Sequence, residues 1–190
     1  MLATCSSDSF EDVRDKALIH VLADTGVRRG ELVGMRWSDL DLAEATITLR
    51  HQTTKARKTR VVAIGNETVR ALRRYVRRLD LLTDDDPMWV GLRGPLLSNG
   101  VGQTITKRAR RAGVTVTAHS FRRGLATRWL RTGGSEVHLM RVAGWSSPRM
   151  VARYTSAVAT EEALRAARGF LQSGSGATSA QNARSRLRAV

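Results

Sequence analysis

Cysteine is almost absent from this sequence, in which Cys5 is the only one among 190 residues. A single cysteine excludes an internal disulfide and a cysteine-based metal cluster, and it is typical of a protein of a reducing, intracellular compartment. The four histidines, at positions 20, 51, 119 and 138, lack the spacing of metal ligands. We therefore expect no metal site.

The sequence also lacks a long apolar run. No stretch is long and apolar enough to span a membrane. The first residues carry Asp8, Glu11, Asp12 and Asp15 where a signal peptide would have an apolar segment. We expect an intracellular protein with no membrane partner.

Acidic residues are scarce relative to basic ones. The sequence has 17 Asp and Glu but 32 Lys and Arg, which gives a net charge of +15 and a pI near 11.5. Such an excess is typical of proteins that neutralise nucleic-acid phosphates. An arginine-rich composition from a GC-rich genome explains part of the charge but not the excess over acid. The 42% apolar content and the length predict one globular domain with a proper core.

Hydrophobic periodicity predicts a mostly helical chain. Apolar residues recur at helical spacing from Phe10 to Ala23, with Asp8 or Ser9 as the N-cap and Gly26 after the end. The helix expected at 66–82 carries arginines at 70, 73, 74, 77 and 78 opposite its apolar face. We interpret them as a solvated surface, with phosphate contact as the alternative. The other helices are expected at about 29–35, 103–112, 119–131, 136–143 (capped by Ser135), 150–154 and 161–170.

Two β-branched segments, 45–49 and 59–64, interrupt this pattern. The polar basic residues between them predict two antiparallel strands joined by a basic turn, and Leu96 and Leu97 are consistent with a further short strand. The fold class is therefore mainly α with a small antiparallel β-sheet (α+β). We expect residues 1–9 to form a disordered or linker N-terminus and residues 172–190, rich in Ser, Gly, Ala and Arg, a flexible basic tail.

His119 and Arg122 are the first residues that suggest a catalytic site for a phosphodiester. Residues three apart lie one turn along a helix, so both heads can reach one space. Histidine passes protons near neutral pH, and the arginine fork fits a phosphate. The pair alone is a weak signal, because it also arises by chance. Arg28 begins an expected helix, where a cation opposes the helix dipole; it is placed either for an anion or for a salt bridge with Glu31.

Two further groups are ambiguous when each is taken alone. Lys55 lies beside the expected turn and reaches over a neighbouring cleft or is simply exposed. Tyr154 carries a hydroxyl that can attack phosphorus or is an ordinary half-buried tyrosine.

Together these motifs resemble the catalytic domain of the tyrosine recombinases, the phage-integrase family. The resemblance covers about residues 8–170, so a catalytic domain is expected over 10–171. Each motif is weak alone, whereas the ordered set is specific. It consists of Thr25-Gly26-x-Arg28-x-x-Glu31-Leu32, Lys55 in the hairpin, His119-x-x-Arg122, and Gly144-Trp145 with Tyr154 nine residues after the tryptophan.

The resemblance implies a role for each matched residue. Arg28 and Arg122 bind the non-bridging oxygens of the scissile phosphate. Tyr154 is the nucleophile and leaves a 3′-phosphotyrosine and a free 5′-hydroxyl. Lys55 protonates the departing oxygen, and His119 assists proton transfer and holds the phosphate.

The remaining matched positions carry supporting roles. Trp145 stands where most members have a second histidine; its indole N–H donates one hydrogen bond but cannot shuttle a proton. Glu31 orients Arg28. Lys58 competes with Lys55 for the general-acid role, and Arg29 neighbours Arg28, although the Thr-Gly-x-Arg frame favours Arg28.

The implied activity is metal-independent, site-specific DNA recombination without a cofactor, because the covalent link conserves the bond energy for rejoining. The implied partners are double-stranded DNA at an attachment-site core and other recombinase protomers, with a monomer expected without DNA. The implied protein is bacterial or phage-encoded, cytoplasmic, and associated with the nucleoid when it acts. The alternatives are a DNA-binding module without turnover, strand relaxation of the type IB topoisomerase kind, and a basic helical nucleic-acid-associated protein with no site.

The sequence departs from the family at its start. Members usually carry an N-terminal helical domain, whereas only about nine residues precede the first expected helix here. The chain is either an excised fragment or a short natural protein, and in both cases weak, salt-sensitive DNA binding is expected. The expected helix at 161–170 docks on a neighbouring protomer or folds onto its own core, and the sequence leaves both open.

Overall fold

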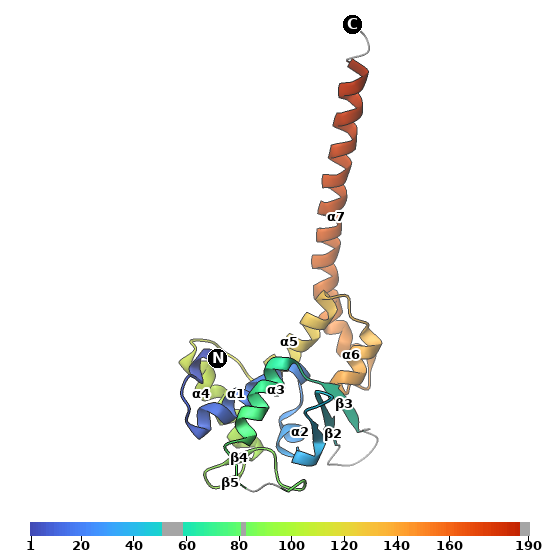
Figure 1. Ribbon diagram of the computed structural model, residues 1–190. Helices are drawn as coiled ribbons and strands as arrows, with labels where there is room; N and C mark the ends of the chain where they lie inside the picture. The colour runs from blue at the N-terminus through green and yellow to red at the C-terminus, as the bar shows by residue number, and fades with distance from the viewer. Residues whose placement is uncertain (51–58, 81–82, 187–190) are drawn as a thin grey trace.

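The computed structural model describes residues 1–50, 59–80 and 83–186. They form a mainly helical body with two small antiparallel sheets, from which the last helix projects (Figure 1). This confirms the expected fold class. The elements are η1 Leu2–Thr4, α1 Phe10–Thr25, α2 Arg29–Val33, η2 Trp37–Asp39, β1 Leu40–Asp41, β2 Thr46–Leu49, β3 Arg60–Ala63, α3 Asn66–Val76, β4 Val90–Gly91, β5 Gly94–Pro95, α4 Ser98–Arg111, α5 Ala118–Arg131, α6 Glu136–Ala143 and α7 Pro148–Arg186.

Helix α1 runs through the centre of the body and packs against α3 and α5. Its start is capped by Ser9, whose hydroxyl accepts from the Asp12 N–H at 3.2 Å. Its end is capped by Gly26 in the left-handed conformation, with φ 56°. A Cβ on Gly26 would lie 2.9 Å from Leu125 Cδ2 of α5, so only glycine allows this close approach.

The three-stranded sheet has the order β1-β2-β3, with Ile47 opposite Val62 and Leu49 opposite Arg60. Ile47, Leu49 and Val62 are buried, so one face of the hairpin packs on the core. The expected antiparallel pair is therefore confirmed. Its connection, with Lys55 and Lys58, lies outside the described residues.

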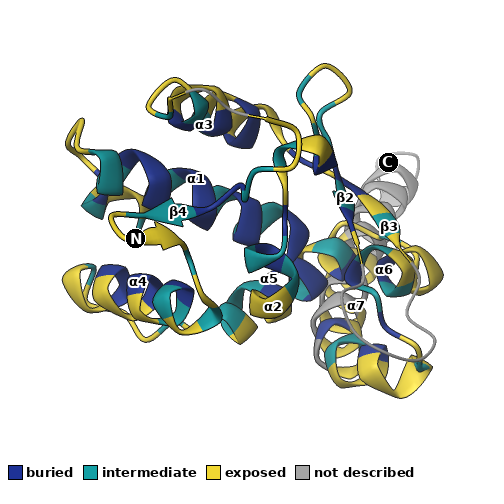
Figure 2. Cartoon of the chain, turned by 90° about the horizontal axis from the view of Figure 1, so that it is seen from below, coloured by how far each residue is buried: buried dark blue, intermediate teal, exposed yellow. Residues whose placement is uncertain are grey.

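The buried residues form two clusters. The larger runs along α1 into α3, α4 and the sheet, shown in dark blue in Figure 2. The smaller joins α5, α6 and the first turns of α7 around Leu130, Leu139, Trp145 and Val151. Burial of these side chains from three helices fixes the beginning of α7 against α5 and α6.

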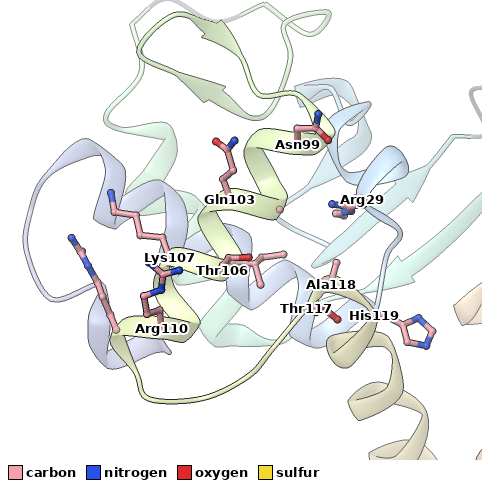
Figure 3. Close-up of a pocket in the computed structure, with 12 residues that line it drawn as sticks. Arg29, Asn99, Gln103, Thr106, Lys107, Arg110, Thr117, Ala118 and His119 are labelled. Atoms are coloured by element: carbon pink, nitrogen blue, oxygen red, sulfur yellow. The ribbon is translucent and has the colours of Figure 1, made fainter.

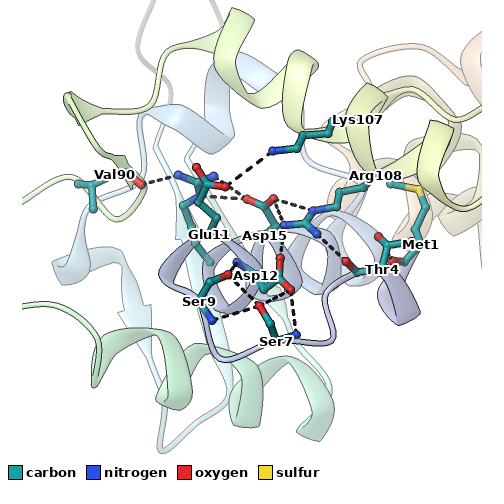
Figure 4. A network of polar contacts seen from close by, with 11 residues as sticks. Met1, Thr4, Ser7, Ser9, Glu11, Asp12, Asp15, Val90, Lys107 and Arg108 are labelled. Carbon is teal, nitrogen blue, oxygen red and sulfur yellow. Dashed lines mark hydrogen bonds and ion pairs between the residues drawn. The ribbon is translucent and has the colours of Figure 1, made fainter.

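Residues 1–9 are not disordered, which was one of the two expectations for this segment. Leu2–Thr4 form η1, and Cys5 is buried. The buried Arg108 of α4 holds this segment, because it donates to the Thr4 carbonyl at 2.5 Å and to Asp12 and Asp15 at 2.7 and 2.8 Å (Figure 4). Hydrogen bonds from Ser7 and Arg108 hold the pKa of the Asp12 carboxyl far below its ordinary value.

Several element boundaries differ from the sequence prediction. Helix α3 ends at Val76, not at 82, because the chain tightens there into i→i+3 bonds such as Leu79 N–H to Val76 O. The short strand expected at 96–97 lies at 94–95, and α4 begins at Ser98 instead of 103.

The largest difference is α7. Segments 150–154 and 161–170 and much of the expected tail belong to one helix that leaves the body (Figure 1). No glycine or proline stands between Pro148 and Gly169 to end it. Across the described residues, none of the helices has the length and apolarity to cross a membrane. The division of the chain at 9 and 171 stays a prediction.

Candidate active site

Arginines from three separate segments meet at the C-terminal end of α6. Three consecutive carbonyl oxygens there accept hydrogen bonds from three different arginines: Val142 from Arg60 at 2.9 Å, Ala143 from Arg122, and Gly144 from Arg28 at 3.4 Å. The last carbonyls of a helix have no partner within it and carry the negative end of its dipole. The end of α6 therefore gathers three guanidinium groups that would otherwise repel one another.

Arg122 is the most enclosed of the three. It lies on α5, is 6% exposed, and also donates to the Gly26 carbonyl at 3.0 Å. Burial and the neighbouring charge of Arg28 lower the pKa of Arg122 to about 10, so it remains charged at neutral pH. Two cations held this close favour the binding of an anion between them.

Arg28 directly precedes α2, in an extended conformation. Its backbone N–H donates to Glu31 Oε2 at 3.0 Å, and its Nη1 lies 3.4 Å from Glu31 Oε1. The sequence left open whether Arg28 serves an anion or a salt bridge. The structure contains the salt bridge, and it also brings the Arg28 and Arg122 guanidinium groups to adjacent carbonyls, those of Gly144 and Ala143.

The Glu31 carboxylate accepts from Arg60 as well as from Arg28. Arg60 donates to both of its oxygens, at 2.8 and 3.1 Å. Burial alone would raise the pKa of Glu31, but the hydrogen bonds from Arg60 and the Arg28 backbone outweigh it and lower the pKa to about 2. Glu31 is therefore ionised at neutral pH.

Arg60 is a site residue that our sequence analysis missed. It begins β3, where alternation places its side chain on the same face as the buried Val62. An arginine at such a position requires a carboxylate partner, and this is the signal from which it could have been found.

Trp145 lies between Arg122 and Tyr154. Its buried indole ring is stacked on the Tyr154 ring with centroids 5.4 Å apart, and Arg122 Cζ lies 5.2 Å from the indole centroid. Tyr154 is half-buried in the first turns of α7. The predicted nucleophile is thus connected through one aromatic ring to a predicted phosphate ligand.

Three of the predicted residues line one cleft of about 740 Å³. Arg28, Glu31 and Trp145 share it with Arg60, His138 and Arg141. Arg28 and Arg122 are joined through adjacent carbonyls, so the two guanidinium groups lie on the same side of the molecule.

His119 stands apart from that cleft. It is exposed at the start of α5 and lines a second cleft, of about 960 Å³, with Arg29 and residues of α4 (Figure 3). Arg122, one turn along α5, is buried toward α6 instead. The sequence predicted that His119 and Arg122 reach one space, but neither cleft is lined by both residues. The role of His119 stays a prediction. Lys55 lies outside the described residues.

The comparison with known families agrees with the motifs. The model of the phage integrase family matches residues 1–161. This chain belongs to the phage integrase family. The membership confirms the resemblance inferred from the sequence.

Curated relatives of this integrase-family chain are bacterial recombinases. Tyrosine recombinase XerC of Thermodesulfovibrio yellowstonii is 29% identical over 160 residues, which cover 79% of this chain and 52% of that protein. XerC of Corynebacterium glutamicum is 31% identical over 153 residues, covering 79% and 49%. The chain therefore spans about half the length of the curated relatives it matches.

Solved structures show the same fold. The crystal structure of XerA recombinase is 32% identical, with a TM-score of 0.74 over 86% of this chain and 59% of that one. XerH recombinase, solved bound to its difH substrate before cleavage, is 19% identical with a TM-score of 0.67, covering 81% and 46%; this likeness concerns the fold alone.

Proposed function

We propose that this chain is the catalytic domain of a site-specific DNA recombinase that cleaves and rejoins strands through a 3′-phosphotyrosine. One observation carries the proposal. Arg28 and Arg122 meet at the end of α6, and Trp145 connects Arg122 to Tyr154. Cations beside a phenol are the groups that an attack on a phosphodiester requires.

The reaction follows from these groups. The two guanidinium groups bind the non-bridging oxygens and offset the charge of the five-coordinate transition state. The Tyr154 oxygen forms a bond to phosphorus while the bond to the 5′-oxygen breaks. Lys55 gives that oxygen a proton, and His119 assists the proton transfer to and from the phenol. Trp145 offers an indole N–H as a hydrogen-bond donor.

Rejoining reverses the same steps with a second 5′-hydroxyl. The phosphotyrosine bond conserves the energy of the broken phosphodiester, so the reaction needs neither ATP nor a metal. A free tyrosine has a pKa of about 10, and the neighbouring cations favour its phenolate when DNA is bound.

The cleft beside α4 supports DNA as the substrate. Figure 3 shows Gln103, Lys107 and Arg110 along one side of α4, all exposed, with His119 at the start of α5. Arginine and lysine contact phosphates, and arginine and glutamine read base edges in the major groove. We propose double-stranded DNA at an attachment core as the partner, with further protomers joining on the DNA, a monomer without it, and action in the cytoplasm.

The decisive experiment uses a pool of nicked suicide duplexes with a randomised core. The chain should form an SDS-resistant adduct, and mass spectrometry should place the nucleotide on Tyr154. Tyr154→Phe should abolish the adduct and retain DNA binding. The matched control is Tyr75→Phe, since Tyr75 is the only other tyrosine and is buried beside Trp89, where its hydroxyl accepts from the Val90 N–H at 3.2 Å.

Each outcome decides between the candidate functions. An adduct that survives Tyr154→Phe would move the nucleophile elsewhere. DNA binding without any adduct would establish a binding module without turnover. Relaxation of supercoiled plasmid without strand exchange would establish the topoisomerase-like activity.

A further inference from the structure

Arg60 makes three hydrogen bonds from a side chain that is 14% exposed. Its two terminal nitrogens donate to the two Glu31 oxygens at 2.8 and 3.1 Å, and its Nε donates to the Val142 carbonyl at 2.9 Å. A planar guanidinium that is bidentate on a carboxylate has one orientation, because both bonds must lie in its plane. Arg60 thus ties β3 to α2 and to the end of α6.

The same carboxylate faces Arg28, but the contact differs. Arg28 Nη1 lies 3.4 Å from Glu31 Oε1, compared with 2.8 Å for Arg60 Nη1 on the same oxygen. The carboxylate is therefore drawn toward Arg60. The contact of the Arg28 guanidinium with the carboxylate is at the outer limit of hydrogen-bond length, whereas the Arg28 backbone N–H donates to the other oxygen, Oε2, at 3.0 Å.

Arg60 also packs on the turn that follows α6. A Cβ on Gly144 would lie 2.9 Å from Arg60 Cζ, so the guanidinium lies directly against the Gly144 backbone. The Gly144 carbonyl accepts from Arg28, and the next residue is Trp145. One arginine therefore contacts two structures that bind the Arg28 side chain, the Glu31 carboxylate and the Gly144 turn.

We propose that Arg60 is a positioning residue for phosphate binding by Arg28. It holds the Glu31 carboxylate toward β3 and so keeps Arg28 from a close ion pair with Glu31. This inference rests on the proposed function for its use in catalysis, whereas the phosphate contact of Arg28 can be measured without catalysis.

Loss of Arg60 leaves a largely enclosed carboxylate with Arg28 as its remaining cation. The Glu31 side chain is 11% exposed, so water compensates only in part for the lost bidentate partner. The carboxylate then pairs closely with Arg28 and competes with phosphate for its guanidinium. Removing the Glu31 charge as well should therefore restore part of the phosphate affinity. If Arg60 had a purely structural role, this second substitution would not improve phosphate binding.

The test compares the wild-type chain with Arg60→Met and with the double variant Arg60→Met, Glu31→Gln. Inorganic phosphate is titrated while the Arg28 side-chain ¹⁵N resonance is followed. Arg60→Met should weaken phosphate binding at Arg28 about tenfold, the equivalent of one charge-assisted hydrogen bond, and the double variant should regain at least half of this loss. Arg50→Met is the matched control, because Arg50 directly follows β2, pairs with the buried Asp39 at the end of η2 and has an exposed side chain.

Cleavage of the nicked duplex provides the second measurement. Arg60→Met should form the adduct on the order of 100-fold more slowly, as misplaced site groups do. The defect should disappear on a methylphosphonate substrate, because the methylphosphonate linkage carries no negative charge and needs no second cation. Unchanged phosphate binding in Arg60→Met, or a double variant weaker than Arg60→Met, overturns the inference. If the wild-type chain forms no adduct, but phosphate binding weakens in Arg60→Met and recovers in the double variant, the inference holds and the proposed function is rejected.

Discussion

The indole ring of Trp145 lies parallel to the phenol ring of Tyr154, with centroids 5.4 Å apart and planes 6° from parallel. Such a stack contributes about 0.5–1.5 kcal/mol beyond the buried area. Arg122 Cζ lies 5.2 Å from the centroid of the same indole. Trp145 therefore sets the position of the proposed nucleophile relative to a proposed phosphate ligand, a role independent of proton transfer.

Substitution of Trp145 should separate stacking from hydrogen bonding. Trp145→Phe keeps an aromatic ring against Tyr154 but loses the N–H, and we expect less than a tenfold loss in the rate of adduct formation. Trp145→Ala should lose tenfold or more at unchanged DNA affinity, measured below the melting temperature because Trp→Ala in a core costs about 3–5 kcal/mol. Equal rates for both variants would show that the stack does not position Tyr154.

Much of the fold could be predicted from local patterns. Helix α1 follows from the spacing of Val13, Leu18 and Leu22 between a serine cap and Gly26. The hairpin follows from alternation in 45–49 and from the β-branched and apolar residues of 59–64. The continuous α7 could not be predicted, because a helix without an apolar stripe along its whole length gives no periodic signal.

The site was predictable as a set of residues but not as an arrangement. Arg28 and Arg122 could be matched to motifs, yet their meeting point, the carbonyls at the end of α6, carries no side-chain signature. The position of Arg60 on the buried face of β3 indicates a carboxylate partner, but not which one, because Glu31 and Val142 are distant in sequence and only the fold brings them to β3.

Gly144→Ala should damage the site more than its local geometry alone would suggest. Gly144 has φ 62°, and a Cβ there would meet the Arg60 guanidinium at 2.9 Å. Gly133→Ala is a matched control, because Gly133 has φ 75° with nothing within 4 Å of a Cβ. Both variants should lose about 1 kcal/mol of stability from the backbone, and only Gly144→Ala should also slow adduct formation. Urea unfolding and adduct assays measure the two effects; equal adduct rates would argue against a role for this contact.

The Glu31 carboxylate should make stability depend on pH. Its pKa falls from an ordinary 4.5 to about 2 on folding, so its contribution is fully present above pH 4.5 and is lost as the pH falls toward 2. The shift corresponds to a contribution on the order of 3 kcal/mol. Glu31→Gln should therefore reduce the free energy of unfolding at pH 6, with a smaller difference from wild type near pH 3. A difference that does not change with pH would show that Glu31 is not held ionised by its arginines.

Lys55 should act as the general acid toward the leaving oxygen. Lys55→Ala should slow cleavage on the order of 100-fold, and a substrate with a 5′-sulfur leaving group should restore the rate, because a thiolate departs without a proton. Lys58→Ala provides the comparison and should be close to wild type on both substrates. Rescue of Lys58→Ala in place of Lys55→Ala would transfer the role to residue 58.

The cleft beside α4 should contact DNA through phosphates and through bases, and two substitutions distinguish these contributions. Arg110→Ala removes one exposed cation from the cleft, so the magnitude of the negative slope of log K against log salt should fall by about 0.9, with binding weakened similarly for every sequence.

Gln103→Ala should instead leave the slope unchanged and reduce discrimination between duplexes by about 1–3 kcal/mol at one base pair, because an amide reads a base edge and carries no charge. Arg73→Ala, on the exposed face of α3 that we interpret as solvated, should change neither quantity. Fluorescence anisotropy over a range of salt concentrations measures both quantities. A smaller slope magnitude for Arg73→Ala and an unchanged slope for Arg110→Ala would place the DNA on the α3 face, since the loss of a cation reduces the slope only where that cation neutralises a phosphate.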